Sequence, residues 1–149
     1  MKFTSLKLAF TIFAQLSLAL STFAANHSQS PIDFTPASTV YTPLPALNYS
    51  YSSSAGLHVY NNGSPSEEST IRADLNTTDS ALSIQGISYT FKQFHFHTDS
   101  EHLLNGVGSP MELHMVHQLA DGSDLLVTGR WIVEGAENTL LTDIFSNFP

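Results

Sequence analysis

The stretch at residues 87–97, ISYTFKQFHFH, is dense in aromatic and β-branched residues and contains neither glycine nor proline. Such a composition is typical of a β-strand. Side chains two residues apart in a strand point to the same face, so His95 and His97 are expected to project together. Gln93 shares that face, while the phenylalanines that precede each histidine point the other way. The stretch therefore predicts a strand with a pair of imidazoles on one face.

A hairpin is predicted further along the chain. A glycine-rich turn follows the first strand, and a second strand is expected at residues 111–119. The turn sequence DGSD at 121–124 leads into a third strand at 125–133, and a short turn of this kind joins antiparallel neighbours. If the second strand runs beside the first, a third histidine, His114, can converge on the imidazole pair.

Three neutral imidazoles with one open position are typical of a catalytic zinc site. Imidazole also suits Cu²⁺ and Ni²⁺, so the ligand type alone does not name the metal. Gln93 and Glu112 each lie two residues before a histidine, and metal-bound histidines commonly donate their other N–H to such groups. A His-X-His pair can equally be a hydrogen-bonded surface pair. Glu101 is open to four interpretations, as a general base, an orienting group, a fourth ligand or a surface acid.

The rest of the chain predicts a mainly β fold of the α+β class. Short strands are expected at 57–60, 69–75 and 81–84, and apolar residues at helical spacing predict one helix over 140–148. The prolines of residues 26–56 exclude helix and central strand, so that segment is expected to run extended over the surface.

Residues 1–25 have the pattern of a secretory signal peptide. A short basic start is followed by an apolar run and by small residues before the expected cleavage near Ala25. The run is too short for a transmembrane anchor, which needs about 20 apolar residues. We therefore expect a secreted protein whose domain occupies residues 26–149, with no membrane span.

Charge and composition exclude several classes of function. Without Lys2 and Lys7 of the leader, the net charge falls from −8 to −10, which argues against a nucleic-acid partner. The chain has no cysteine, so disulfides and thiolate metal sites are impossible. Glycosylation sequons start at Asn26, Asn48, Asn62 and Asn76, of which Asn62 is the poorest candidate because Pro65 follows its acceptor serine. The oligomeric state is left open.

Several strings resemble the α-carbonic anhydrase family, in order along residues 28–149. They are Ser28-Gln29-Ser30-Pro31-Ile32, the turn Asn61-Asn62-Gly63, Gln93-Phe94-His95-Phe96-His97, Ser100-Glu101-His102-Leu103 and Met111-Glu112-Leu113-His114-Met115-Val116-His117. The resemblance implies a large, twisted, mostly antiparallel sheet. It also implies zinc-dependent, reversible hydration of carbon dioxide to bicarbonate and a proton.

The resemblance assigns roles to individual residues. His95, His97 and His114 would hold Zn²⁺, with Gln93 and Glu112 as their hydrogen-bond partners. Glu101 would orient a threonine of a later loop. Val116 and Val127 would line the apolar pocket for carbon dioxide, although ordinary packing in the sheet explains two valines equally well.

Two departures from the family pattern affect the expected activity. The position of the proton-shuttling histidine falls on Ser64, which cannot titrate near neutral pH, whereas histidine, with a pKa of about 6.5, can. We therefore expect a slower or buffer-dependent enzyme. The chain also stops at Pro149, before the threonine loop, which predicts a C-terminally truncated domain.

Two other functions compete with this one. Without the threonine loop, the chain could be a non-catalytic zinc-binding relative of the family. The pattern His95-X-His97 followed by Glu101 also resembles the first cupin motif, in which the glutamate is itself a ligand. The second cupin motif is absent from the sequence, and the Gln-Ser-Pro string would then be unexplained.

Overall fold

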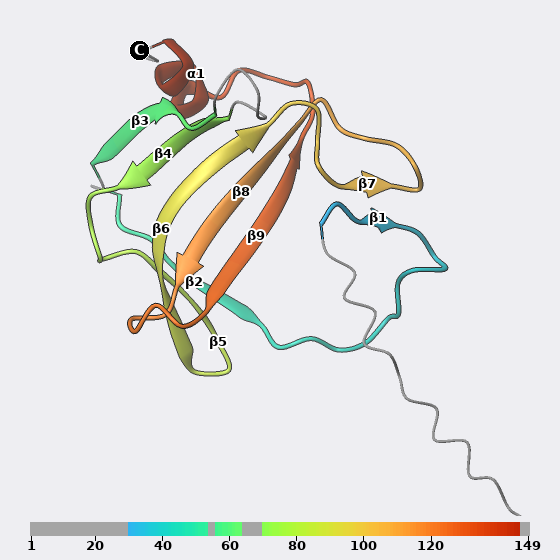
Figure 1. Cartoon of the computed structure of the whole chain (residues 1–149), viewed down its shortest axis with the longest axis horizontal. Helices are drawn as coiled ribbons and strands as arrows, with labels where there is room; N and C mark the ends of the chain where they lie inside the picture. The colour runs from blue at the N-terminus through green and yellow to red at the C-terminus, as the bar shows by residue number, and fades with distance from the viewer. Residues whose placement is uncertain (1–29, 54–55, 64–69, 147–149) are drawn as a thin grey trace, which may run out of the picture.

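The computed structural model describes residues 30–53, 56–63 and 70–146 (Figure 1). The predicted leader at 1–25, the sequon at Asn26 and the shuttle position Ser64 lie outside these residues. Within the described part, the chain forms nine strands and one helix. No helix there is long and apolar enough to cross a membrane.

Seven strands form one antiparallel sheet, in which the central strand β6 is the longest. They are β2 (Leu47–Ser50), β3 (Leu57–Asn61), β4 (Ile71–Leu75), β5 (Ala81–Ile84), β6 (Ile87–His97), β8 (Met111–Gln118) and β9 (Leu125–Ile132). One edge of β6 pairs first with β5 and then with β4, which continue to β2 and β3 respectively. The other edge pairs with β8, and β8 pairs with β9. The prediction of a large antiparallel sheet is therefore confirmed.

The start of β6 is fixed by a tight hairpin with β5. Gln85 and Gly86 form the connection, with φ angles of 51° and 81°. Two left-handed residues in a row suit the twist of flanking antiparallel strands. The hairpin sets the register of β6, and thereby the face on which its histidines lie.

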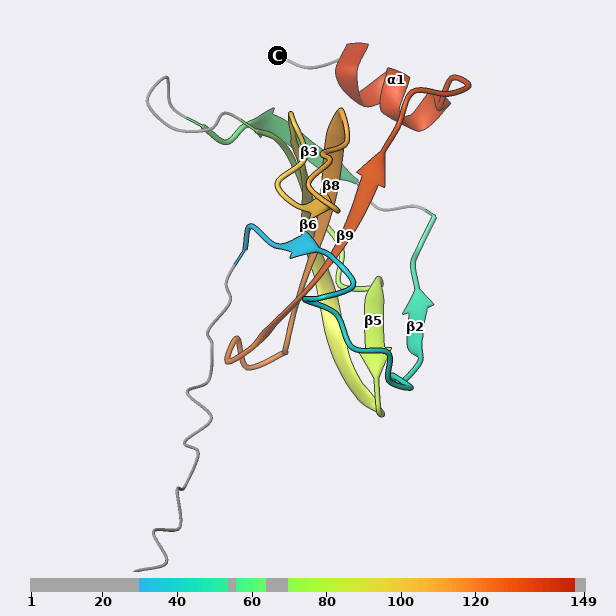
Figure 2. The ribbon, with the colours of Figure 1, turned by 90° about the vertical axis from the view of Figure 1, so that its right-hand side faces the viewer.

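The face of β6 opposite the histidines contributes to the core. Phe91 and Phe96 are buried there, together with Leu82 of β5 and Ala73 of β4. The helix α1 (Thr139–Ser146) adds buried Ile144 and places the ring of Phe145 5.3 Å from that of Phe96. Both views show α1 at the end of the sheet near β3, away from β2 and β5 (Figures 1 and 2).

Two short strands lie outside this sheet. β1 (Asp33–Phe34) pairs in parallel with β7 (Leu103–Leu104). The N-terminal segment is mainly extended, as expected, and its strand β2 occupies an edge of the large sheet. The sequence analysis did not predict β1, β2 or β7. β1 and β7 have two residues each, too few to show a period, and β2 lies in the segment whose prolines pointed to an extended surface chain. The other boundaries agree to within two residues.

Candidate metal centre

The three histidines singled out in the sequence meet on one face of the sheet. His95 of β6 is directly opposite His114 of β8, and His97 is opposite Glu112. Directly opposed residues of an antiparallel pair share a face, so all four side chains point to the same side. The prediction that His114 would converge on the imidazole pair is confirmed.

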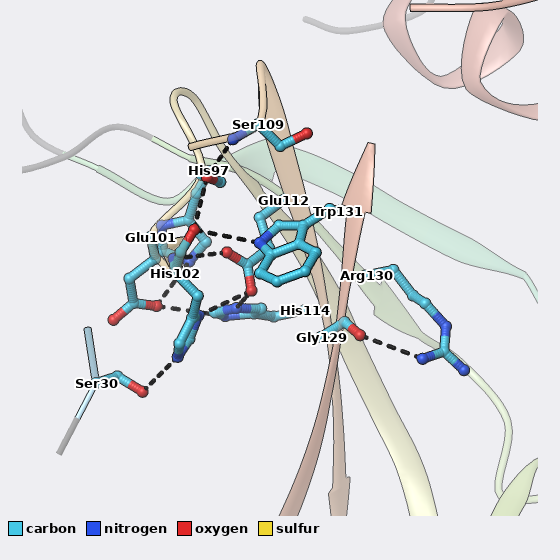
Figure 3. A network of polar contacts seen from close by, with 11 residues as sticks. Ser30, His97, Glu101, His102, Ser109, Glu112, His114, Gly129, Arg130 and Trp131 are labelled. Atoms are coloured by element: carbon cyan, nitrogen blue, oxygen red, sulfur yellow. Dashed lines mark hydrogen bonds and ion pairs between the residues drawn. The ribbon is translucent and has the colours of Figure 1, made fainter. Parts of the chain in front are cut away.

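The imidazole rings are close enough to share one ion. Ring centroids are 5.0 Å apart for His95 and His97, 5.3 Å for His95 and His114, and 4.6 Å for His97 and His114. One nitrogen from each ring lies within 4.8 Å of the other two. His97 and His114 are labelled in Figure 3, where the carboxylate of Glu112 lies above the ring of His114 and that of Glu101 lies to its left.

Hydrogen bonds orient two of the rings. The side-chain oxygen of Gln93 lies 2.9 Å from Nδ1 of His95, and an oxygen of Glu112 lies 3.0 Å from Nε2 of His114. Each oxygen accepts an N–H, which leaves Nε2 of His95 and Nδ1 of His114 with their lone pairs toward the cluster. Nε2 of His97 is shielded from solvent beside them. This set of three imidazole nitrogen donors fits Zn²⁺.

Burial and hydrogen bonds set the protonation states of two residues of the centre, His95 and Glu112. Desolvation lowers the pKa of His95 to about 4, and electrostatic repulsion from His97 and His114, when these are protonated, and from Arg72 lowers it further. Burial of Glu112 opposes ionisation, but hydrogen bonds from the backbone of His102 and from the rings of His114 and His102 outweigh it and lower its pKa. At neutral pH the ring of His95 is therefore neutral and Glu112 is an anion.

Glu101 lies at the edge of the cluster. Its carboxylate is 3.7 Å from Nδ1 of His114 and 3.9 Å from Nε2 of His97, and its side chain is about a quarter exposed. Glu101, His102 and His114 also have potential ligand atoms within 4.8 Å of one another. Both ring nitrogens of His102, however, already face Glu112 and Ser30. The three-histidine set is therefore the better metal site.

A cavity of about 820 Å³ opens beside His95 and His114 on the β9 side. Val116 and Val127, directly opposite each other in β8 and β9, both line it. Phe34 and Trp131 contribute two further apolar walls, with their rings edge-to-face at 6.0 Å. The structure thus places the two predicted pocket valines next to His95 and His114.

Three residues of the centre escaped the sequence analysis. His102 and Ser30 were quoted only as parts of the strings that carry the family resemblance, and they hydrogen-bond each other at 3.0 Å. Gly129 is opposite His114 in β9, and a Cβ there would lie 2.9 Å from an oxygen of Glu112. A glycine inside a strand often marks a close approach, which was the available signal for Gly129.

Two of the predicted glycosylation sites fall on exposed residues. Asn48 lies in the edge strand β2, and Asn76 follows the end of β4. The backbone N–H of Asn76 donates to the carbonyl of Gly56, and the residue is exposed. Both asparagines are on the surface of the described structure.

The fold and the site together define a class: a mainly antiparallel β protein with three histidines gathered on one sheet face. A comparison with known families makes the assignment specific, since the model of the eukaryotic-type carbonic anhydrases matches residues 18–126. The chain belongs to this family. It is not a cupin.

Individual relatives agree with this assignment. A carbonic anhydrase of Neisseria gonorrhoeae is 36% identical over 122 residues, which cover 82% of this chain and 45% of that protein. The α-carbonic anhydrase of Thermovibrio ammonificans, solved with sulfanilamide, has a TM-score of 0.70 at 35% identity and covers 81% of this chain and 50% of its own. Dioscorin, solved with ascorbate, has a TM-score of 0.68 at 26% identity, covering 79% and 47%. The chain therefore spans about half the length of the relatives it matches.

Proposed function

We propose that this protein supplies the zinc-holding part of a carbonic anhydrase and acts in the reversible hydration of carbon dioxide to bicarbonate and a proton. The observation that carries the proposal is the convergence of His95, His97 and His114 on one sheet face beside an apolar-walled cavity. The family assignment supports the same reaction.

The role of the three histidines is to present neutral nitrogens in a fixed geometry. Gln93 accepts the Nδ1–H of His95, and Glu112 accepts the Nε2–H of His114, so each ring is held in the tautomer that exposes the other nitrogen. When bound there, zinc lowers the pKa of a coordinated water so that a nucleophile exists at neutral pH, a property for which carbonic anhydrases are the standard example.

The substrate side of the site is apolar. Val116 and Val127 form a hydrocarbon wall next to the histidines. Carbon dioxide has no charge and makes only weak hydrogen bonds, so it loses little on leaving water for such a surface. Bicarbonate is charged and is retained less well by the same wall, which favours its release.

Two further residues govern the proton chemistry of the proposed reaction. The carboxylate of Glu101 lies within 4 Å of two of the histidines, where it can accept a hydrogen bond from a hydroxyl group positioned beside the metal. Ser64 stands at the expected shuttle position and cannot carry a proton near pH 7. Proton export should then depend on buffer in solution.

The proposal extends to the secretory pathway. The leader pattern at residues 1–25 supports export, and the exposed positions of Asn48 and Asn76 are compatible with glycan attachment. Treatment of the secreted protein with a glycosidase, followed by intact-mass measurement, would give the cleavage site and the number of glycans together.

The central test combines metal binding with turnover. Zinc stoichiometry and affinity are measured by competition with a chromogenic chelator, and carbon dioxide hydration by stopped-flow with a pH indicator in several buffers. One tightly bound zinc with hydration above the buffer rate supports the proposal. Zinc binding without hydration would favour the non-catalytic zinc-binding alternative, and no zinc binding would contradict both.

A further inference from the structure

Strands β3 and β4 form a polar part of the sheet face on which the metal centre lies. Two rows of directly opposed residues cross the sheet there, with Tyr60, Arg72 and His95 in one row and His58, Asp74 and Gln93 in the next. Directly opposed residues of antiparallel strands share a face, so the four side chains from β3 and β4 point to the same side as the proposed metal ligands. Figure 1 shows β3 and β4 on the side of β6 away from β8 and β9.

Hydrogen bonds hold three of these polar side chains together. Nε of Arg72 donates to one oxygen of Asp74 at 2.7 Å, and the hydroxyl of Tyr60 donates to the other oxygen at 3.1 Å. The guanidinium carbon of Arg72 also lies 5.8 Å from the centre of the Tyr60 ring. The charge of Arg72 contributes to the low pKa of His95, so this polar part is close enough to influence the metal centre.

His58 lies at the outer end of the polar part, on strand β3. The residue is exposed, and its ring stacks on that of Tyr60 with centroids 5.1 Å apart and 26° between the ring planes. Because β4 lies between β3 and β6, two strand spacings, about 10 Å, separate His58 from β6. A chain of water molecules can bridge a gap of this size between the imidazole and the centre.

The proposed reaction gives such a histidine a role. Each bicarbonate formed from carbon dioxide and water releases one proton, which must reach bulk solvent. Histidine is the side chain whose ordinary pKa, about 6.5, lets it take up and release a proton near neutral pH. The other histidines of the described residues have different positions: His95, His97 and His114 in the centre, His102 between Glu112 and Ser30, and His117 buried on the opposite face.

Within the described residues, three charged or titratable side chains face His58. They are Tyr60 on its own strand and Asp74 and Arg72 on β4. Burial and the hydrogen bond to Asp74 raise the pKa of Tyr60, and the guanidinium of Arg72 keeps its proton, so neither exchanges a proton near neutral pH. Both oxygens of Asp74 accept hydrogen bonds from these two residues. His58 is therefore the group of the polar part that can carry a proton.

We propose that His58 carries protons between the metal centre and solvent. One ring nitrogen accepts a proton from water on this face of the sheet, which gives an imidazolium. The other ring nitrogen then releases its proton to solvent and the ring is neutral again, so one proton leaves for each bicarbonate formed. The inference rests on the proposed function. The route through His58 works beside the export through buffer and needs no buffer itself.

The test combines a titration with kinetics on the full chain. Proton NMR of the imidazole C–H signals gives the pKa of His58 in the metal-free and in the zinc-loaded protein, at low ionic strength. Stopped-flow hydration at low and at high buffer concentration gives kcat and kcat/KM. The variants are His58→Gln and His58→Ala at this exposed position, and Lys92→Gln, which removes another exposed titratable group of the same sheet, is the matched control.

Zinc at the centre should lower the pKa of His58 by a few tenths, because a cation on the same face disfavours the imidazolium. His58→Gln should lower kcat at low buffer by about tenfold, less than the roughly 10²-fold of a proton donor in direct contact, because His58 acts through water. High buffer should restore kcat, and free imidazole should do the same for His58→Ala. The ratio kcat/KM should stay at the wild-type value, because proton export follows the hydration step. Lys92→Gln should change none of these quantities.

The outcomes separate this inference from the proposed function. If the wild type shows no hydration at any buffer concentration, the proposed function fails and the role of His58 fails with it. If the wild type hydrates carbon dioxide and His58→Gln keeps the wild-type kcat at low buffer, only the role of His58 is wrong. A pKa of His58 that ignores zinc would also contradict it. A loss of kcat/KM equal to the loss of kcat would place the effect in the hydration step and overturn the proton-carrying role.

Discussion

Strands β6 and β9 both pair with β8 in antiparallel register, one on each side. Their site-facing residues nevertheless differ in exposure and in hydrogen bonding. On the β6 side, His95 is half-buried and its ring is hydrogen-bonded to Gln93. On the β9 side, Val127 is 49% exposed and Trp131 is 39% exposed. Within the described residues, β9 pairs with β8 alone.

This difference implies that metal affinity and turnover depend on different parts of the sheet. The groups that would hold the metal are tied by short hydrogen bonds inside β6, β8 and the loop that carries His102. Val127 and Trp131, which would face substrate, lie on the exposed, apolar strand β9, where desolvation is incomplete. Metal affinity and turnover should therefore respond to different substitutions.

The largest expected effect is a loss of metal affinity, caused by a substitution among the hydrogen-bonded histidines of β6 and β8. His114→Ala removes one of three ligands and should weaken zinc binding about 10³-fold. That factor corresponds to the loss of about a third of the zinc-binding free energy, which is roughly 10–16 kcal/mol at structural zinc sites. Leu125→Ala on β9 should leave zinc affinity within about twofold, because Leu125 does not line the cavity. Chelator competition measures both, with circular dichroism as a check on folding. Equal losses of zinc affinity in His114→Ala and Leu125→Ala would contradict the separation between metal-holding and substrate-facing residues.

The same contrast should be visible in stability. Leu82 is completely buried and Leu125 is 55% exposed. Leu82→Ala should lower the free energy of unfolding by about 2–5 kcal/mol, through lost burial and the cavity left behind. Leu125→Ala should cost less than about 1 kcal/mol. Urea denaturation of the two variants makes the comparison, and a large loss from Leu125→Ala would show that β9 is covered in solution.

The strands of the centre could be predicted from sequence because each is long and strongly patterned. Residues 87–97 and the hairpin that follows gave both the strands and the convergence of the histidines. The β-bulge in β6 between Phe91 and Gln93 could not be foreseen. Simple alternation would place Phe91 on the histidine face, but the extra residue sends it into the core beside His117, with ring centroids 4.8 Å apart.

The network around Glu112 was beyond sequence reasoning for a different reason. Contacts between Ser30 and His102 join segments 72 residues apart, and no local pattern encodes such a pair. His117 shows the opposite case of a histidine with no part in the site. It lies three residues from His114 and therefore on the other face, where it is completely buried against the hydroxyl of Tyr51 and the carbonyl of Leu126.

Acid should destabilise the metal-free protein before its carboxylates titrate. Burial lowers the pKa of His95 from 6.5 to about 4, and burial also lowers that of His117. Between about pH 6.5 and pH 4 the unfolded chain binds protons on these histidines that the folded chain does not bind. The free energy of unfolding therefore falls as the pH drops through this interval. Urea denaturation at half-unit pH steps checks this, and a flat profile over that interval would contradict it.

Gly129 tests how tightly the two sides of β8 are joined. In Gly129→Ala the new Cβ would lie 2.9 Å from an oxygen of Glu112, so the carboxylate must move away from His114. We expect a loss of about 1–3 kcal/mol in stability and about tenfold in zinc affinity. Gly135→Ala is the matched control, since a Cβ there meets nothing within 4 Å. A harmless Gly129→Ala would mean that Glu112 has more room than the structure shows.

Among the substitutions next to the histidines, Glu101→Gln should change metal affinity least. The carboxylate lies 3.7 Å from Nδ1 of His114, close enough to influence the centre but without the contact that a ligand makes. Glutamine has the same shape, so zinc affinity should stay within about twofold, whereas hydration should fall by about 10²-fold if Glu101 orients a reacting hydroxyl. Zinc affinity and the hydration rate are measured on the same preparation. Loss of zinc would instead make Glu101 a fourth ligand. The residues that determine metal affinity would then include the loop that carries Glu101.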